Sequence, residues 1–271
     1  MRKRVPIALL IGAGLLAGCA GLPGGRHRAA VNGIQICYLV NGRGPALLLL
    51  HGGGGNALAL RRQIRDFGRH FKVIAPDSRG HGCSTDDRDT LSYHLMAEDM
   101  VALLDRLHVR SAHVMGWSDG AIVGIDLALH HPDRVRKLVL FGANFRPDGI
   151  EPATLAWLRA AWPDDSTDWA QNPGQPHSMD SKLRRLWLTQ PGFRPAELAA
   201  IRAPTLVAVG DHDFPRLEHT VELARAIPGA QLCVIPGASH GVLHERPALA
   251  DEIVLQFLRA PMPTAQAPRR P

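Results

Sequence analysis

The sequence predicts an α/β fold in which a mostly parallel central sheet is flanked by helices. Two observations lead to this prediction. Short apolar runs alternate with longer segments whose apolar residues recur at helical spacing, and several of the apolar runs end in glycine, aspartate or histidine. Because parallel strands need a crossover connection, this alternation is typical of βαβ units. Most of the 271 residues suit one domain of this class.

The expected elements follow one another along the chain. A hairpin joins residues 30–31 to 34–40 across Asn32-Gly33, a dipeptide that favours a two-residue turn. The next strand, 46–50, is apolar throughout, as expected for a central parallel strand. Further strands are expected at 71–75, 112–116, 136–142, 204–210 and 231–235. Helices are expected at about 57–68, 91–107, 119–131, 216–227 and 243–259.

The alternation also suggests how the chain is divided. The expected segments are a signal peptide at 1–18, a tether at 19–29, a core at 30–143 and 196–260, a cap insertion at 144–195 and a disordered Pro-rich tail at 261–271. The cap interrupts the strand–helix alternation and holds four of the five tryptophans, Trp157, Trp162, Trp169 and Trp187. These side chains either form an aromatic lid over a substrate pocket or build the core of a small helical subdomain. The sequence leaves both interpretations open.

The most informative window is Gly116-Trp117-Ser118-Asp119-Gly120, between an expected strand and an expected helix. A serine between two glycines at such a turn is typical of a nucleophile elbow, whose strained backbone projects the hydroxyl from the edge of the sheet. Side chains at Gly116 and Gly120 would clash in that turn. Since G-x-S-x-G also occurs by chance, the prediction depends on finding catalytic partners for Ser118.

These partners follow later in the chain. A serine nucleophile needs a general base, and the base needs an orienting carboxylate. The strand expected at 204–210 is followed by Asp211 and Asp213, and the strand expected at 231–235 leads to His240. Because the carboxyl ends of parallel strands share one edge, we expect Ser118, Asp213 and His240 to form a catalytic triad. Asp211 is the alternative acid, although its place directly after the strand favours bracing of the turn.

An oxyanion hole is expected at the loop that follows strand 46–50, which reads as one histidine and four glycines at 51–55. Backbone N–H groups from such a loop, and from the residue after the nucleophile, stabilise a tetrahedral oxyanion. Gly53 and Asp119 are the expected donors, with Gly54 as the alternative to Gly53. A phosphate-binding loop is the weaker interpretation, because no Gly-Lys-Ser/Thr follows. We expect His51 to hold the loop in place.

Together with the D-x-RGHG-x-S pattern at 77–84, these motifs resemble the α/β-hydrolase family along essentially the whole mature chain. The resemblance implies a serine hydrolase that cleaves a small carboxylic ester through an acyl-enzyme, without a cofactor. Dehalogenases and epoxide hydrolases of this fold carry Asp at the elbow, so Ser118 argues against both. Lactone, amide and C–C bond hydrolysis use the same machinery and stay open, as do a cell-envelope aminopeptidase and a non-catalytic binding protein that retains the fold.

Two stretches are similar to a narrower group, the serine hydrolases of the valacyclovir hydrolase type. They are GWSDG at 116–120 and VLFGAN at 139–144. This resemblance implies cleavage of α-amino acid esters, with Asp119 receiving the substrate ammonium group, and we expect Trp117 and Asp119 to bind substrate. Ala121 departs from the group, which usually has glycine there. An acid in the first turn of a helix is also favoured by the helix dipole alone.

The N-terminus has the features of an export signal. Three cations at 2–4 precede an apolar segment that ends at Gly18 and is shorter than the about 20 residues of a bilayer span. The segment Leu16-Ala17-Gly18-Cys19 resembles a bacterial lipobox, which implies lipidation of Cys19 and anchoring to the cell envelope, at the periplasmic face of the outer membrane in a diderm. An ordinary signal peptide cut near Ala20, or an uncleaved anchor, would also export the chain.

Charge and cysteine usage exclude several other classes of site. Without Arg2, Lys3 and Arg4, the formal charge of +6 falls to +3, and no basic face typical of nucleic-acid binding remains. The cysteines other than Cys19 are Cys37, Cys83 and Cys233, which allow at most one disulfide; we expect none. Histidines and carboxylates show no metal-like cluster better than the triad, so no metal site is expected. The expected partners are a small ester and the membrane, and the oligomeric state is not predicted.

Overall fold

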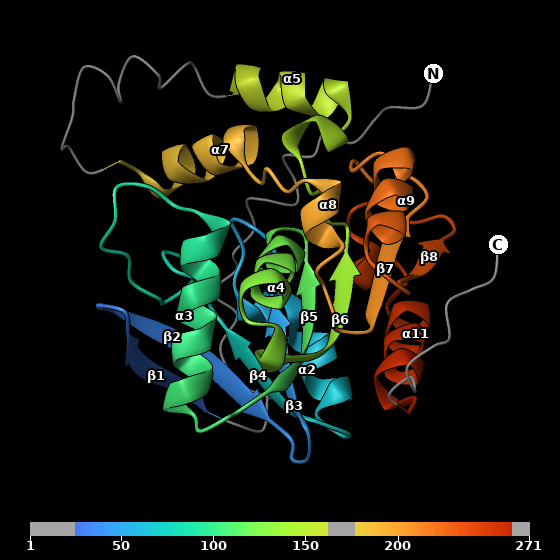
Figure 1. Ribbon diagram of the computed structural model, residues 1–271. Helices are drawn as coiled ribbons and strands as arrows, with labels where there is room; N and C mark the ends of the chain where they lie inside the picture. Colours follow the sequence, from blue (N-terminus) through green and yellow to red (C-terminus); the bar gives the residue numbers. More distant parts are fainter. Residues whose placement is uncertain (1–24, 162–176, 262–271) are drawn as a thin grey trace.

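The computed structural model describes residues 25–161 and 177–261 and contains the predicted α/β architecture (Figure 1). The sheet has eight strands in the order β1-β2-β4-β3-β5-β6-β7-β8. Strand β2 is antiparallel to β1 and β4, and the other neighbouring strands are parallel. The strands are β1 Arg26–Val31, β2 Ile34–Asn41, β3 Ala46–Leu50, β4 Lys72–Pro76, β5 Ala112–Trp117, β6 Val135–Phe141, β7 Thr205–Gly210 and β8 Gln231–Ile235. The predicted fold class is thereby confirmed.

Helices cover both faces of this sheet. The longer helices are α2 Arg61–Phe67, α3 Tyr93–Arg106, α4 Asp119–His130, α5 Pro152–Ala161, α7 Met179–Thr189, α9 Leu217–Ala226 and α11 Pro247–Arg259. Helices α3, α4 and α9 pack in one apolar cluster, and α2 and α11 pack in the other. Helices α5 and α7 lie beyond the carboxyl ends of β5 and β6 (Figure 1).

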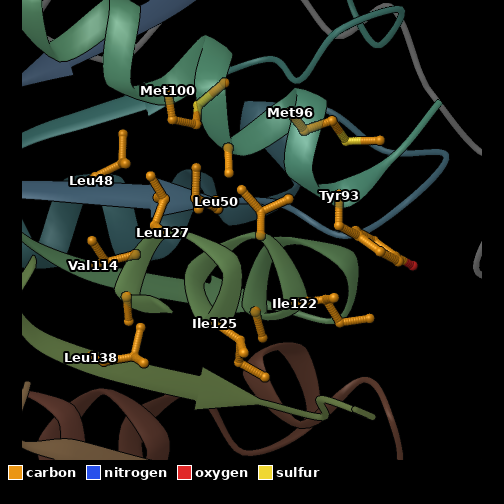
Figure 2. Close-up of a cluster of buried hydrophobic side chains, with 14 of the residues drawn as sticks. Leu48, Leu50, Tyr93, Met96, Met100, Val114, Ile122, Ile125, Leu127 and Leu138 are labelled. Atoms are coloured by element: carbon orange, nitrogen blue, oxygen red, sulfur yellow. The ribbon is translucent and has the colours of Figure 1, made fainter. Parts of the chain in front are cut away.

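The cluster on the α3–α4 face shows how the sequence periodicity becomes packing. Figure 2 shows Leu48, Leu50, Val114 and Leu138 of the strands together with Ile122, Ile125 and Leu127 of α4 and Met96 and Met100 of α3. Alternate strand residues point to one face, whereas residues three or four apart on a helix share a stripe. Burial of these two surfaces against each other fixes the position of α4, and therefore of the turn that precedes it.

Two expected helices differ in detail from the prediction. The helix expected at 57–68 consists of a 3-10 turn, η1 (Ala57–Leu60), followed by α2. The helix expected at 243–259 is split into α10 (Val242–Glu245) and α11, and Arg246 between them has non-helical backbone angles. The reason is Pro247, which has no N–H to continue a helix but is well suited to begin one.

A disulfide joins Cys37 of β2 to Cys83 of the loop after β4, so the expectation of no disulfide is wrong. The two Cα atoms lie 5.6 Å apart although 46 positions separate the residues in the sequence. The loop runs back along β2, where the Cys37 N–H donates to Ser84 Oγ at 2.9 Å. Cys233 is a free, half-buried thiol whose pKa is raised by burial.

Several predictions concern residues that lie outside the described part of the chain. These are the signal peptide at 1–18, Cys19 and the first part of the tether, the segment 162–176 of the cap with Trp162 and Trp169, and the tail after residue 261. Within residues 25–161 and 177–261, no helix has the length and apolar character needed to cross a membrane.

Candidate active site

Ser118 lies at the junction of β5 and α4 and has φ 57° and ψ −124°. A positive φ is unfavourable for a residue with a side chain, so the turn is strained, as a nucleophile elbow requires. The flanking glycines make the turn possible. A Cβ on Gly116 would lie 2.1 Å from the Gly120 carbonyl oxygen, and one on Gly120 would lie 2.4 Å from the Leu50 carbonyl oxygen. Neither position has space for a side chain, which is the reason the sequence analysis gave for both glycines.

The structure brings together the three residues predicted to form the triad. The Ser118 Oγ lies 2.9 Å from His240 Nε2, and His240 Nδ1 lies 2.7 Å from Asp213 Oδ1. The three residues follow β5, β7 and β8, so they meet at the carboxyl edge of the sheet. In this arrangement the serine hydroxyl can pass its proton to an imidazole whose charged form is stabilised by the carboxylate.

Asp213, rather than Asp211, contacts His240. The Asp213 side chain is fully buried, and its Oδ1 also accepts the Phe214 N–H at 2.7 Å. Asp211 instead accepts the Ala238 N–H at 3.1 Å and so braces the loop that leads to His240. Backbone hydrogen bonds, above all from Gly237, hold the pKa of Asp211 at about 2.

Two contacts that the sequence analysis missed position the His240 ring. The Phe214 ring lies with its centroid 3.8 Å from the His240 ring. Gly142, which has φ +58°, lies beneath the pair: a Cβ there would approach the His240 ring to 3.0 Å and Asp213 Oδ2 to 3.1 Å. The sequence signal for Phe214 is its place directly after the acid, whereas Gly142 lies in the VLFGAN stretch at 139–144, which was noted as a resemblance without a role for the glycine.

Trp117 also holds His240. Its indole N–H donates to the His240 carbonyl oxygen at 2.9 Å, and its ring contacts the rings of both His240 and His244, with centroid distances of 5.6 and 5.4 Å. These contacts give Trp117 a part in positioning the base. Its contact with substrate stays a prediction.

The glycine loop lies beside the nucleophile. A Cβ on Gly52 would lie 3.1 Å from the Ser118 Cβ, and one on Gly53 would lie 2.2 Å from Asp119 Oδ2. The predicted oxyanion donors Gly53 and Asp119 are therefore neighbours. His51 holds the loop, since its Nε2 accepts the Ser78 N–H at 2.9 Å while its Nδ1 lies 2.7 Å from the Gly52 carbonyl oxygen. Burial and the nearby His81 lower the pKa of His51 to about 4, which keeps this ring neutral.

Asp119 is buried, with 7% of its surface exposed, and two neutral donors hold its carboxylate. The Tyr93 hydroxyl donates to Oδ1 at 3.0 Å, and the Trp187 indole N–H donates to Oδ2 at 2.8 Å. Burial raises the pKa of Asp119, while the hydrogen bond from Trp187 opposes the increase. Burial also raises the pKa of Tyr93 well above its usual value. Trp187 of α7, in the segment expected to form a cap, thus lies at the site, whereas no sequence signal pointed to Tyr93.

Two groups of residues with potential metal ligands occur in the described part of the chain, and neither contains a triad residue. The first is Cys37, Asp77 and Cys83, whose two sulfur atoms are already joined in the disulfide. The second is His94, Asp126 and His130, on the α3–α4 surface. In the described part of the chain, the groups around Ser118 include its own hydroxyl, the His240 imidazole, the carboxyl groups of Asp119 and Asp213, the Tyr93 hydroxyl and backbone amides.

Comparison with known proteins places this geometry in a family. A family model described as the alpha/beta hydrolase fold matches residues 45–176. The chain is 30% identical to a protein of Azorhizobium caulinodans named putative carbamate hydrolase RutD, over 82% of this chain and 94% of that protein. It is 28% identical to the serine hydrolase BPHL of Homo sapiens, over 83% and 82% of the two chains. The enol-lactonase of Burkholderia xenovorans superposes with a TM-score of 0.72 at 25% identity, over 86% of this chain and all of that one. The chain therefore belongs to the α/β-hydrolase family and is a hydrolase.

Proposed function

We propose that this hydrolase cleaves small carboxylic esters through an acyl-enzyme. Ser118 Oγ attacks the ester carbonyl carbon while His240 Nε2 takes the hydroxyl proton, and Asp213 stabilises the imidazolium. Backbone N–H groups of Gly53 and Asp119 stabilise the oxyanion. The observation that carries this proposal is the chain of hydrogen bonds from Ser118 through His240 to Asp213, with lengths of 2.9 and 2.7 Å.

The remaining steps use the same groups. The C–O bond of the ester breaks as His240 returns its proton to the leaving alcohol, and an ester bond joins the acyl group to Ser118. Water then attacks the acyl-enzyme with His240 as general base, which releases the acid and restores the serine. The contacts of Trp117 and Phe214 with His240 support this cycle, because the ring has to serve Ser118 and water from one position.

The environment of Asp119 favours α-amino acid esters among the possible substrates. Among the described residues, the two groups that donate to this carboxylate are neutral, and each carboxylate oxygen can accept more than one hydrogen bond. A substrate ammonium group would therefore add a charged donor to a buried acid next to the nucleophile, where attraction between charges is stronger than in water. A plain acyl chain would leave the acid without that partner.

The test is a set of initial hydrolysis rates on a matched panel, with Ser118→Ala as control. The panel contains short acyl esters, the corresponding α-amino acid esters, a lactone, a carbamate and aminoacyl arylamides. The lactone and the carbamate are included because the lactonase and RutD relatives are named for those bonds. Ester hydrolysis that Ser118→Ala abolishes supports the proposal. Faster turnover of lactone, carbamate or arylamide than of every ester would contradict it.

A second measurement separates the catalytic mechanism from the choice of substrate. A fluorophosphonate probe reacts with an activated serine whatever the natural acyl group, and we expect one adduct, on Ser118. No adduct in folded protein would favour a non-catalytic binding protein. A preference for α-amino acid esters that Asp119→Asn abolishes, while plain esters keep their rate, would assign the ammonium site to Asp119.

We also propose that the enzyme is exported and held at the cell envelope by lipid on Cys19. The basic, apolar N-terminus that ends in Leu16-Ala17-Gly18-Cys19 supports this, and so does the Cys37–Cys83 disulfide, because disulfides persist in oxidising compartments. Metabolic labelling with an alkyne fatty acid tests it. Wild-type protein is expected to carry the label in the membrane fraction, and Cys19→Ala to lose it. Equal labelling of both proteins would disprove the lipid site.

A further inference from the structure

A cluster of imidazole and carboxylate groups lies where α3 and α4 pack together, outside the Ser118 site. His94 is the second residue of α3, while Asp126 and His130 lie one helical turn apart on α4. The Nδ1 atoms of His94 and His130 lie 2.9 and 3.0 Å from the same oxygen, Asp126 Oδ1. Two helices that are distant in the sequence thus direct three potential metal ligands to one point.

We propose that His94, Asp126 and His130 bind a divalent transition-metal ion, for which Zn²⁺ is the best match. The three donor atoms all lie within 4.8 Å of one another. Ligand atoms about 2.0–2.1 Å from a tetrahedral Zn²⁺ are about 3.4 Å apart, so the rings need to separate from the carboxylate by only about half an ångström. Two imidazoles and one carboxylate also form a donor set that Zn²⁺ accepts, with the fourth position filled by water.

The exposure of the three side chains would allow an ion to reach them from solvent. The Asp126 side chain is only 5% exposed, whereas those of His94 and His130 are 55% and 50% exposed. The carboxylate is therefore held by packing, and the two rings, whose centroids lie 4.7 Å apart, are exposed to solvent beside it. Rings at an exposed position can make the small rotation that coordination requires.

Glu98 adds an outer contact of the kind that orients metal-bound histidine. The Nε2 of His94 faces Glu98 Oε1 at 4.0 Å, and the same oxygen lies 2.5 Å from His131 Nε2. When Nδ1 of His94 binds the metal, the proton of the neutral ring resides on Nε2, where it can donate toward Glu98.

Metal binding would join the two helices that begin at the active site. Helix α3 starts at Tyr93 and α4 starts at Asp119, and these residues are hydrogen bonded to each other at 3.0 Å. An ion on His94, Asp126 and His130 would join the first turn of α3 to the last two turns of α4. We therefore expect bound metal to stabilise the folded enzyme. It is not expected to take part in the attack of Ser118 on the substrate.

The experiment measures Zn²⁺ binding by calorimetry to protein purified without a polyhistidine tag and freed of metal by chelation. We expect one Zn²⁺ per chain, a Tm increase of about 5 °C at a hundredfold excess of Zn²⁺ over Kd, and the visible absorption of tetrahedral Co²⁺ when cobalt replaces zinc. His94→Gln and His130→Gln are each expected to weaken binding at least tenfold. Glu98→Gln is expected to weaken it about tenfold, because only the outer contact is lost.

The control is His70→Gln, which alters an exposed histidine far from this cluster along the chain. It is expected to bind Zn²⁺ as the wild type does. Absence of binding, or equal affinity in the His94→Gln and His130→Gln variants, would overturn the proposal. Both histidines are exposed, so the metal-free variants are expected to unfold at the wild-type Tm, which separates lost binding from lost folding. Ser118→Ala is expected to bind Zn²⁺ normally, so this test is independent of the proposed ester hydrolysis.

Discussion

The indole nitrogen of Trp187 donates a 2.8 Å hydrogen bond to the carboxylate of Asp119, which joins helix α7 to the residue immediately after Ser118. The second oxygen of the same carboxylate accepts the Tyr93 hydroxyl. Three segments that are far apart in the sequence therefore meet on one buried acid. The position of α7 is linked in this way to the environment of the nucleophile.

Trp187→Phe is expected to destabilise the protein by about 1.5–3 kcal/mol, the usual contribution of a hydrogen bond to a charged group. The substitution also removes a donor that lowers the pKa of Asp119, so that pKa is expected to rise further. Urea unfolding at pH 7 measures the first effect. Trp187→Phe in an Asp119→Ala background, where the acceptor is absent, controls for ring size. If Trp187→Phe costs the same stability in both backgrounds, the hydrogen bond to Asp119 has no special role.

Asp213→Asn is expected to lower kcat by about three to four orders of magnitude with little change in KM. An amide at this position no longer stabilises the imidazolium and favours the wrong tautomer of His240. Asp211→Asn is the matched control, because Asp211 binds the Ala238 N–H and lies two residues from the acid. Steady-state kinetics on the best ester of the panel measures both. A loss for Asp211→Asn as large as that for Asp213→Asn would show that the acid is wrongly assigned.

Removal of the Cys37–Cys83 disulfide is expected to destabilise the protein by about 2–4 kcal/mol, since closing a loop of this size in the unfolded chain restricts its conformations. Urea unfolding of Cys37→Ala/Cys83→Ala, and of the wild type with reductant, measures the change. Cys233→Ala, which alters the free thiol, is expected to respond to reductant as the wild type does. A midpoint that reductant leaves unchanged would show that the disulfide contributes nothing.

Acid is expected to destabilise the protein between pH 6.5 and pH 4 through its buried histidines. Burial, with Arg136 and Lys137 nearby, lowers the pKa of His113 to about 4. Below pH 6.5, His113 of the unfolded chain takes up a proton, whereas folded His113 stays neutral until the pH approaches 4. The contribution of His113 to the free energy of unfolding is therefore fully present above pH 6.5 and is lost as the pH falls toward 4. One such group contributes about 3 kcal/mol over this range.

His113→Leu is the variant that tests this, because His113 lies in β5 at the opposite end from Ser118. Its unfolding free energy is expected to change less between pH 6.5 and pH 4 than that of the wild type. His70→Gln, at an exposed position, is expected to keep the wild-type pH dependence. An identical slope in His113→Leu and wild type would show that His113 binds its proton equally in the folded and unfolded states.

The sequence by itself determined the order of strands and helices, the nucleophile turn and the candidates for base and acid. These features depend on neighbouring residues. Apolar spacing of two or about four decides which face of a strand or helix is buried, and the glycines around Ser118 are required by atoms within the turn and the adjacent strand. Even the interruption before Pro247 is local, although the sequence analysis extended one helix across it.

Only the tertiary structure decided which distant side chains meet. Cys37 and Cys83 pair because β2 lies against β4. The number and spacing of the cysteines do not reveal that these two strands are adjacent. The contacts of Tyr93 and Trp187 with Asp119, and the meeting of His94 with Asp126 and His130, depend on how α3 and α7 pack against α4. Packing between elements is determined by the complementarity of whole surfaces, which no short window of sequence contains. The periodicity of the chain therefore predicts the elements, and their packing decides the contacts at the site.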